Sequence, residues 1–131
     1  MSETRRIMVV EDDFDMREVL VDLLTGSGFE VRAVEDGVAA LRLLRTLPLP
    51  DLIMLDLMMP GMNGWQLLAE LRRDPAWAAI PSVVLSAVTP RYMPIAGATV
   101  ALEKPVTATV LLGTIDALTH APADRRSASG E

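Results

Sequence analysis

Polar side chains follow short apolar runs of this sequence, at the residue where each run ends. Two acids follow the first run, an acid and a hydroxyl close two later runs, and a lysine follows the last: Glu11 and Asp12, Asp56, Ser86, and Lys104. Three carboxylates in one pocket would raise one another's pKa values unless a cation joined them. Oxygen ligands without His or Cys favour a hard ion such as Mg²⁺, which keeps several of its waters. The sequence therefore predicts a magnesium site if the fold gathers these ends.

Asp56 is the residue around which this chemistry would be organised. An Asp carboxylate beside Mg²⁺, the Lys104 ammonium group and the Ser86 hydroxyl can attack phosphorus, because the cations neutralise charge on the phosphoryl oxygens. The backbone N–H of Ala87 would add a donor. The product would be an aspartyl phosphate, whose charge can bias a loop or an interface. A lone Asp at a strand end is more often a helix cap or a solvated group, so this interpretation depends on the other residues.

The apolar runs are short and alternate with helical patterns. Runs of this length bounded by Pro or Gly are typical of strands buried on both faces. The expected strands are 7–10, 30–34, 52–56, 82–86 and 100–103, and the expected helices are 14–28, 37–45, 63–73 and 107–119. Such alternation predicts βαβ units, a parallel sheet and helices on both faces. The ends of the first, third, fourth and fifth strands then share one edge, where ligands bind in such sheets.

Other residues of these elements have simpler structural interpretations. Apolar residues at helical spacing, Met16, Val19, Leu20, Leu23 and Leu24, predict the buried side of the first helix. Asp13 or Asp15 can cap that helix, with Glu18 in the capping-box position after Asp15, and capping is a better role for Asp13 than metal binding. Trp65 and Trp77 are expected to pack against the core. The methionines at 54, 58, 59 and 62 are expected to fill gaps around the third strand.

Composition limits the classes of protein that remain. The 131 residues predict one domain over 1–120, followed by a disordered tail or linker over 121–131. The chain has no cysteine, which excludes disulfides, thiolate metal sites and cysteine nucleophiles. A net charge of −6 argues against direct nucleic-acid binding, and no apolar run is long enough to span a membrane. We therefore expect a cytoplasmic protein.

Four pieces of the sequence, in order and on the expected elements, resemble the receiver domain of two-component response regulators. They are VVEDD at 9–13, DLIMLDLMMPGMNG at 51–64, VLSA at 84–87 and KP at 104–105. The resemblance extends over roughly residues 5–119. It implies a flavodoxin-like, doubly wound, five-stranded parallel sheet with strand order 2-1-3-4-5.

The resemblance also implies a role in a two-component system or phosphorelay. Asp56 would accept a phosphoryl group from a sensor histidine kinase or a phosphotransfer protein, and phosphorylation would switch binding to a downstream protein. Asp12 and Asp56 would bind Mg²⁺ directly, Glu11 would act mostly through water, and the Met58 carbonyl would be a further ligand. Such a domain assists its own phosphorylation and dephosphorylation without turning over a separate substrate.

Two further positions take their roles from the same resemblance. Ser86 and Lys104 would contact the phosphoryl group. The Lys104–Pro105 peptide bond would be cis, which costs little before proline.

The sequence departs from the family pattern at two places. Ala101 stands where most members carry an aromatic residue that swings inward after phosphorylation. The segment between Ser86 and Lys104 is short and interrupted by Pro90 and Pro94, so the helix that relatives place there is expected to be stunted or absent. We therefore expect that the chain does not signal through the face formed by that helix, the last strand and the last helix.

Two other features bear on the output and lifetime of the phosphorylated state. Tyr92 is a candidate replacement for the missing aromatic, although a surface or packing role is the simpler interpretation. Met58 and Val88 flank the site with apolar side chains that cannot hydrogen-bond an attacking water. The sequence therefore predicts slow loss of the phosphoryl group.

Three other functions remain open from the sequence. A pseudo-receiver would keep the fold as a phosphorylation-independent interaction module, which Ala101 favours and the intact acidic set opposes. A phosphatase of the haloacid-dehalogenase type would need an Asp where Met58 stands. A flavodoxin-like electron carrier would need a hydroxyl-rich loop after the first strand.

Overall fold

The computed structural model describes residues 4–46, 48–87 and 95–129, with side chains as far as Thr119. Five parallel strands form one sheet in the order β2-β1-β3-β4-β5. They are β1 (Arg6–Val10), β2 (Glu30–Val34), β3 (Leu52–Asp56), β4 (Ser82–Ser86) and β5 (Val100–Glu103). This order confirms the expected flavodoxin-like, doubly wound sheet.

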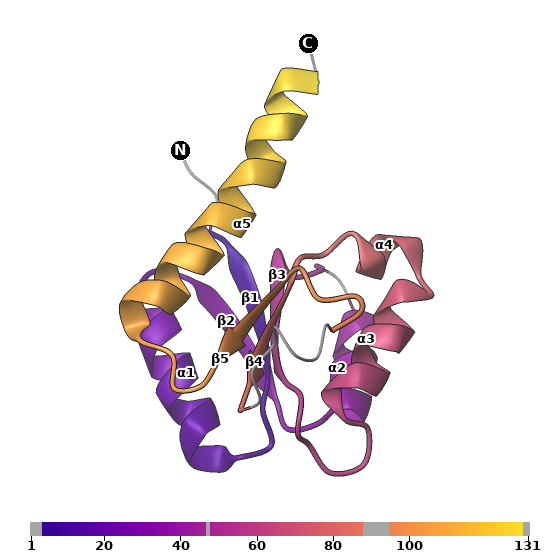
Figure 1. The fold of residues 1–131 in the computed structure, drawn as a ribbon. Coiled ribbons are helices and arrows are strands. Elements are labelled where there is room, and N and C mark those ends of the chain that lie inside the picture. Colours follow the sequence, from indigo (N-terminus) through magenta and orange to yellow (C-terminus); the bar gives the residue numbers. More distant parts are fainter. Residues whose placement is uncertain (1–3, 47, 88–94, 130–131) are drawn as a thin grey trace.

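Helices cover both faces of the sheet (Figure 1). On one face lie α1 (Phe14–Gly26) and α5 (Ala108–Ser129), and on the other lie α2 (Gly37–Leu44) and α3 (Gly64–Arg72). A single turn, α4 (Pro75–Ala78), follows α3. Side chains alternate along β1, so that Ile7 and Val9 join the α1/α5 core while Met8 and Val10 join the α2/α3 core.

The central strands are the most deeply buried part of the chain. Every residue of β3 and β4 is buried, whereas β2 and β5, at the edges of the sheet, are partly exposed. A strand covered on both faces must be apolar along its whole length, which is why β3 appears in the sequence as a continuous run. The acid that ends β3 is therefore held by a rigid element.

Helix starts are fixed by side-chain caps. The Asp13 carboxylate accepts the Met16 N–H and caps α1, as expected for Asp13; Asp15 and Glu18 do not form the capping box there. The capping box lies at α3, where Asn63 and Gln66 each accept the other's backbone N–H. Such a cap stabilises a helix by about 1 kcal/mol.

The structure differs from the sequence expectations in several details of the helices. Met16 and Val19 are exposed, and of the predicted residues α1 fully buries only Leu20 and Leu24, so the buried stripe is narrower than predicted. The short helix α4 was not among the expected elements: Pro75 begins it, with Asp74 as its cap, because proline suits the first turn of a helix.

The C-terminal helix is longer than expected. It continues to Ser129 instead of ending at Thr119. The division into a domain over 1–120 and a linker over 121–131 stays a prediction.

Candidate functional site

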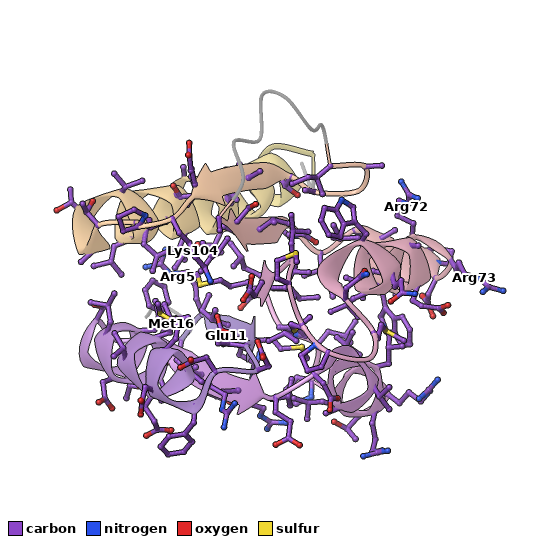
Figure 2. All side chains as sticks on the ribbon, turned by 60° about the horizontal axis from the view of Figure 1, so that its bottom comes forward. Arg5, Glu11, Met16, Arg72, Arg73 and Lys104 are labelled. Carbon is purple, nitrogen blue, oxygen red and sulfur yellow. The ribbon has the colours of Figure 1, made fainter. Side chains whose placement is uncertain are left out.

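The carboxyl ends of the strands form an acidic pocket at one edge of the sheet. Figure 2 looks onto this edge and shows Glu11 and Lys104 near its centre, with Met16 of α1 beside them. The pocket is lined by four acids of the β1–α1 region, two apolar side chains of α1, the acid that ends β3, and a lysine: Glu11, Asp12, Asp13, Asp15, Met16, Val19, Asp56 and Lys104. The fold therefore gathers most of the predicted site residues.

Asp56 is held by hydrogen bonds to both of its carboxylate oxygens. The Lys104 ammonium group donates to Oδ2 at 3.3 Å, and the backbone N–H of Met58 donates to Oδ1 at 3.2 Å. The residue is only 6% exposed. Both bonds are long for charge-assisted contacts, so the oxygens keep capacity for a further partner.

Glu11 is the buried acid of the site. Its Oε2 accepts the Asp13 N–H at 3.2 Å, while its Oε1 lies 3.9 Å from the Lys104 ammonium nitrogen and accepts no hydrogen bond among the described residues. Burial raises the pKa of the Glu11 carboxyl from 4.5 to about 7. The nearby Asp56 carboxylate also raises this pKa, whereas the Asp13 N–H and Lys104 oppose the rise.

The acidic residues fit a cation. One carboxylate oxygen from each of Glu11, Asp12 and Asp56 can be chosen so that all three lie within 4.8 Å of one another. The partnerless Glu11 Oε1 is a buried acceptor, which normally has a partner. Asp12 is exposed, so the group opens to solvent and an ion can enter. All the ligand atoms are oxygens, which suits a hard ion.

The other predicted site residues lie around this group. Ser86 ends β4 and is buried, and its carbonyl accepts the Lys104 N–H at 2.7 Å, which fixes the start of the β5–α5 loop. The Lys104–Pro105 bond is cis, as expected. The roles of Ser86 as a phosphoryl contact and of the Met58 carbonyl as a metal ligand stay predictions.

Met58 corrects one expectation about the methionines. Its side chain is 63% exposed, so it does not fill a gap around β3, whereas Met54 and Met59 are buried. Its backbone N–H donates to Asp56, and its side chain, two residues past that acid, lies in solvent. Trp65 and Trp77 pack against the α2/α3 core, as predicted.

Sequence reasoning missed one residue that holds the β1–α1 loop. The Arg17 guanidinium group donates to the Glu11 carbonyl at 2.8 Å and lies 3.5 Å from the Asp12 carbonyl. The sequence indicates this role only by the position of Arg17, one helical turn past the cap Asp13. From that position a long side chain can reach back over the strand end.

Gly64 is a second residue whose role the sequence did not reveal. A Cβ there would lie 2.6 Å from Leu57 Cα and 2.8 Å from the Asp56 carbonyl oxygen, closer than such atoms approach. The Gly64 N–H donates to the Leu57 carbonyl at 2.9 Å. The start of α3 therefore lies directly against the backbone of Asp56, which only glycine allows.

Some predictions concern residues outside the described part of the chain. These are the apolar flank at Val88, the proline-interrupted helix around Pro90 and Pro94, and the substitute aromatic Tyr92. Ala101 is described: it is half-buried in β5 and packs against the α2/α3 core.

A family model described as "Response regulator receiver domain" matches residues 7–116. Among curated proteins, the DNA-binding response regulator MtrA of Mycobacterium tuberculosis (strain ATCC 25618 / H37Rv) is 45% identical over 85 residues, which are 65% of this chain and 36% of MtrA. The phosphate regulon transcriptional regulatory protein PhoB of Escherichia coli K12 is 42% identical over 83 residues, 63% of this chain and 36% of PhoB. The chain thus spans about a third of the length of these relatives.

Solved structures show the same similarity. The chemotaxis response regulator CheY4 of Vibrio cholerae superposes with a TM-score of 0.82 at 26% identity, covering 88% of this chain and 99% of CheY4. The receiver domain of a signal transduction histidine kinase from Syntrophus aciditrophicus has a TM-score of 0.82 at 30% identity and covers 90% of this chain and 92% of that one.

The described ranges contain no helix that is both long and apolar enough to cross a membrane. A cytoplasmic location stays a prediction.

Proposed function

Because the chain belongs to the response regulator receiver domain family, we propose that Asp56 accepts a phosphoryl group and that this modification switches a protein–protein contact. The observation that carries the proposal is the position of Lys104. Its ammonium group lies 3.3 Å from Asp56 Oδ2 and 3.9 Å from Glu11 Oε1, inside a group of three carboxylates. A single cation among three acids leaves negative charge for a metal ion to balance.

The chemistry is the transfer of a phosphoryl group from one side chain to another. An Asp56 oxygen forms the new O–P bond while the P–N bond to a histidine of the donor protein breaks, and the imidazole keeps the electron pair. Lys104 already donates to Asp56, and we propose that it donates to an oxygen of the transferred phosphoryl group. The Ser86 hydroxyl, at the end of the adjacent strand, is the second proposed donor.

Glu11, Asp12, Asp56 and the Met58 carbonyl are the proposed ligands of Mg²⁺. Bound there, the ion would supply positive charge to the phosphoryl oxygens. The protein's contribution is to hold the carboxylates in place at the ends of β1 and β3 before the reaction begins. The domain would assist its own phosphorylation and dephosphorylation, and it would not turn over a separate substrate.

Exposed apolar side chains beside the pocket support a protein as the phosphoryl donor. Phe14 and Val19 of α1 are 63% and 60% exposed, and Met16 is exposed as well. Met16 and Val19 also line the acidic pocket. Large apolar groups on a surface helix favour contact with another protein. We propose that a sensor histidine kinase or a phosphotransfer protein covers this part of α1.

The downstream partner is proposed to be a protein. MtrA is named a DNA-binding response regulator, but this chain matches only about a third of it. The net charge of −6 opposes direct binding of this domain to nucleic acid.

A binding experiment tests the proposal. Beryllofluoride, a phosphoryl mimic, should bind wild type in the presence of Mg²⁺ and change the fluorescence of Trp65, which follows Gly64 in the first turn of α3. Asp56→Asn should give no such change. A wild type that responds no more than Asp56→Asn would remove the proposed function.

The half-buried Ala101 favours a second candidate, a pseudo-receiver that binds its partner without phosphorylation. The same titration separates the two functions. A pseudo-receiver would respond to beryllofluoride no more than Asp56→Asn does.

A further inference from the structure

Arg17 is a cation that lies beside the acidic pocket and bonds to main-chain oxygens. Among the described residues it forms no ion pair with a carboxylate; its guanidinium group donates to the Glu11 carbonyl at 2.8 Å and lies 3.5 Å from the Asp12 carbonyl. It also lies over the Phe14 ring, 5.4 Å from the ring centre. Arg17 is half-buried, so these contacts fix its side chain between the loop and α1.

The two carbonyls belong to the residues whose side chains are the candidate metal ligands. They lie between the end of β1 and the start of α1, and no backbone N–H of the described residues donates to either of them. Two backbone donors of this loop are bonded elsewhere: the Glu11 N–H donates to the Val34 carbonyl at 3.1 Å and the Asp13 N–H to the Glu11 carboxylate at 3.2 Å. Arg17 supplies donors to both carbonyls and so links the β1–α1 loop to α1.

We propose that Arg17 is a positioning residue that holds the backbone of the β1–α1 loop so that the carboxylates of Glu11 and Asp12 face a shared cation. The inference rests on the proposed function, because it assumes that Mg²⁺ binds these acids. Groups that orient metal ligands without touching the metal commonly contribute about tenfold to a hundredfold in affinity.

The charge of Arg17 and its position predict opposite effects of its removal on Mg²⁺ affinity. If the Arg17 charge acted only through its field, its removal would strengthen the binding of a cation, since like charges repel. If Arg17 positions the loop, its removal weakens binding although one positive charge has gone. The sign of the change in Mg²⁺ affinity therefore separates the two.

Arg17→Met tests this, because methionine keeps an apolar stem and removes both the charge and the donors. Arg17→Gln is a second variant with a shorter stem. Arg72→Met is the matched control, since it removes an exposed arginine on α3 that lies far from Glu11 and Lys104 (Figure 2). Mg²⁺ binding is followed by amide NMR of the full chain, and the free energy of unfolding is measured in urea for each variant.

The expected result is Mg²⁺ binding weakened about tenfold or more in both Arg17 variants and unchanged in Arg72→Met. Phosphorylation by acetyl phosphate should be slower at low Mg²⁺ and should recover at saturating Mg²⁺. Unchanged or tighter Mg²⁺ binding in Arg17→Met would overturn the inference alone. So would weaker binding that only parallels a loss of folding stability in both variants. If wild type binds no Mg²⁺, the proposed function fails first and the inference with it.

Discussion

Glu11 shows how one buried acid couples the site to pH. In the folded chain its pKa is about 7, chiefly because burial disfavours the charged form, whereas its ordinary value is 4.5. Between these values the folded state holds a proton that the unfolded state has lost. The contribution of Glu11 to stability is therefore fully present below about pH 4.5 and is lost as the pH rises through 7.

This sign gives a prediction for Glu11→Gln, which cannot ionise. Without Mg²⁺, the variant should gain stability relative to wild type between pH 5 and pH 8, by up to about 3 kcal/mol. Urea unfolding with a chelator present at both pH values measures the change. An equal difference between variant and wild type at the two pH values would show that Glu11 ionises normally.

Met58 governs the predicted lifetime of the phosphorylated state. Its side chain is exposed and follows the acceptor, so replacing it should cost little stability. Met58→Asn places an amide where it can hydrogen-bond an attacking water, and one such bond is worth about tenfold in rate. The decay of phosphorylated protein, followed by intact mass, should be faster in Met58→Asn and unchanged in Met58→Leu. Equal decay in all three proteins would contradict the role of this side chain.

Single residues differed in how well the sequence could predict them. Glu11, Asp56 and Lys104 were predicted to meet because strand ends in a parallel sheet share an edge, which depends only on topology. Arg17 was not, because its bonds go to main-chain carbonyls and an arginine on a helix has many possible directions. The raised pKa of Glu11 depends on burial, which spacing in the sequence does not measure.

At the scale of elements, α3 and the acceptor strand are joined through Gly64. A Cβ there would meet backbone atoms of Leu57 and Asp56, which cannot move aside as a flexible side chain can. Gly113 of α5 is the opposite case, since a Cβ would meet nothing within 4 Å.

These two glycines form a matched pair for a stability test. Gly64→Ala should destabilise the fold by about 1–3 kcal/mol, as overpacking does, and should weaken beryllofluoride binding by displacing Asp56. Gly113→Ala should be neutral or stabilise by up to about 1 kcal/mol, because alanine is the better helix former. Urea unfolding of both variants decides this. A Gly64→Ala protein as stable as wild type would show that α3 can shift freely.

Elements were predicted well where a single physical rule decides them. The strands β2, β3, β4 and β5 have the expected bounds, because apolar or alternating runs bounded by turn residues leave little choice. The one-turn α4 was missed because its four residues are too few to show a helical period in the sequence. The outward direction of Met16 and Val19 depends on how α1 lies on the sheet, which its own spacing does not fix.

At the scale of the whole molecule, Ala101 bears on how the signal leaves the domain. It packs as a small side chain against the α2/α3 core, so β5 carries no ring there that could move after phosphorylation. We expect the domain to keep its oligomeric state when beryllofluoride binds. Small-angle scattering with and without the mimic measures this. A dimer that forms only with beryllofluoride, through the face of β5 and α5, would refute the expectation.

The central claim concerns one bond between Asp56 and phosphorus. Wild type incubated with acetyl phosphate and Mg²⁺ should gain the mass of one phosphoryl group, and peptide mapping should place that group on Asp56. The gain should vanish in Asp56→Asn and when Mg²⁺ is chelated. A wild-type mass that never changes, or an equal gain in Asp56→Asn, would contradict the assignment of Asp56 as the acceptor.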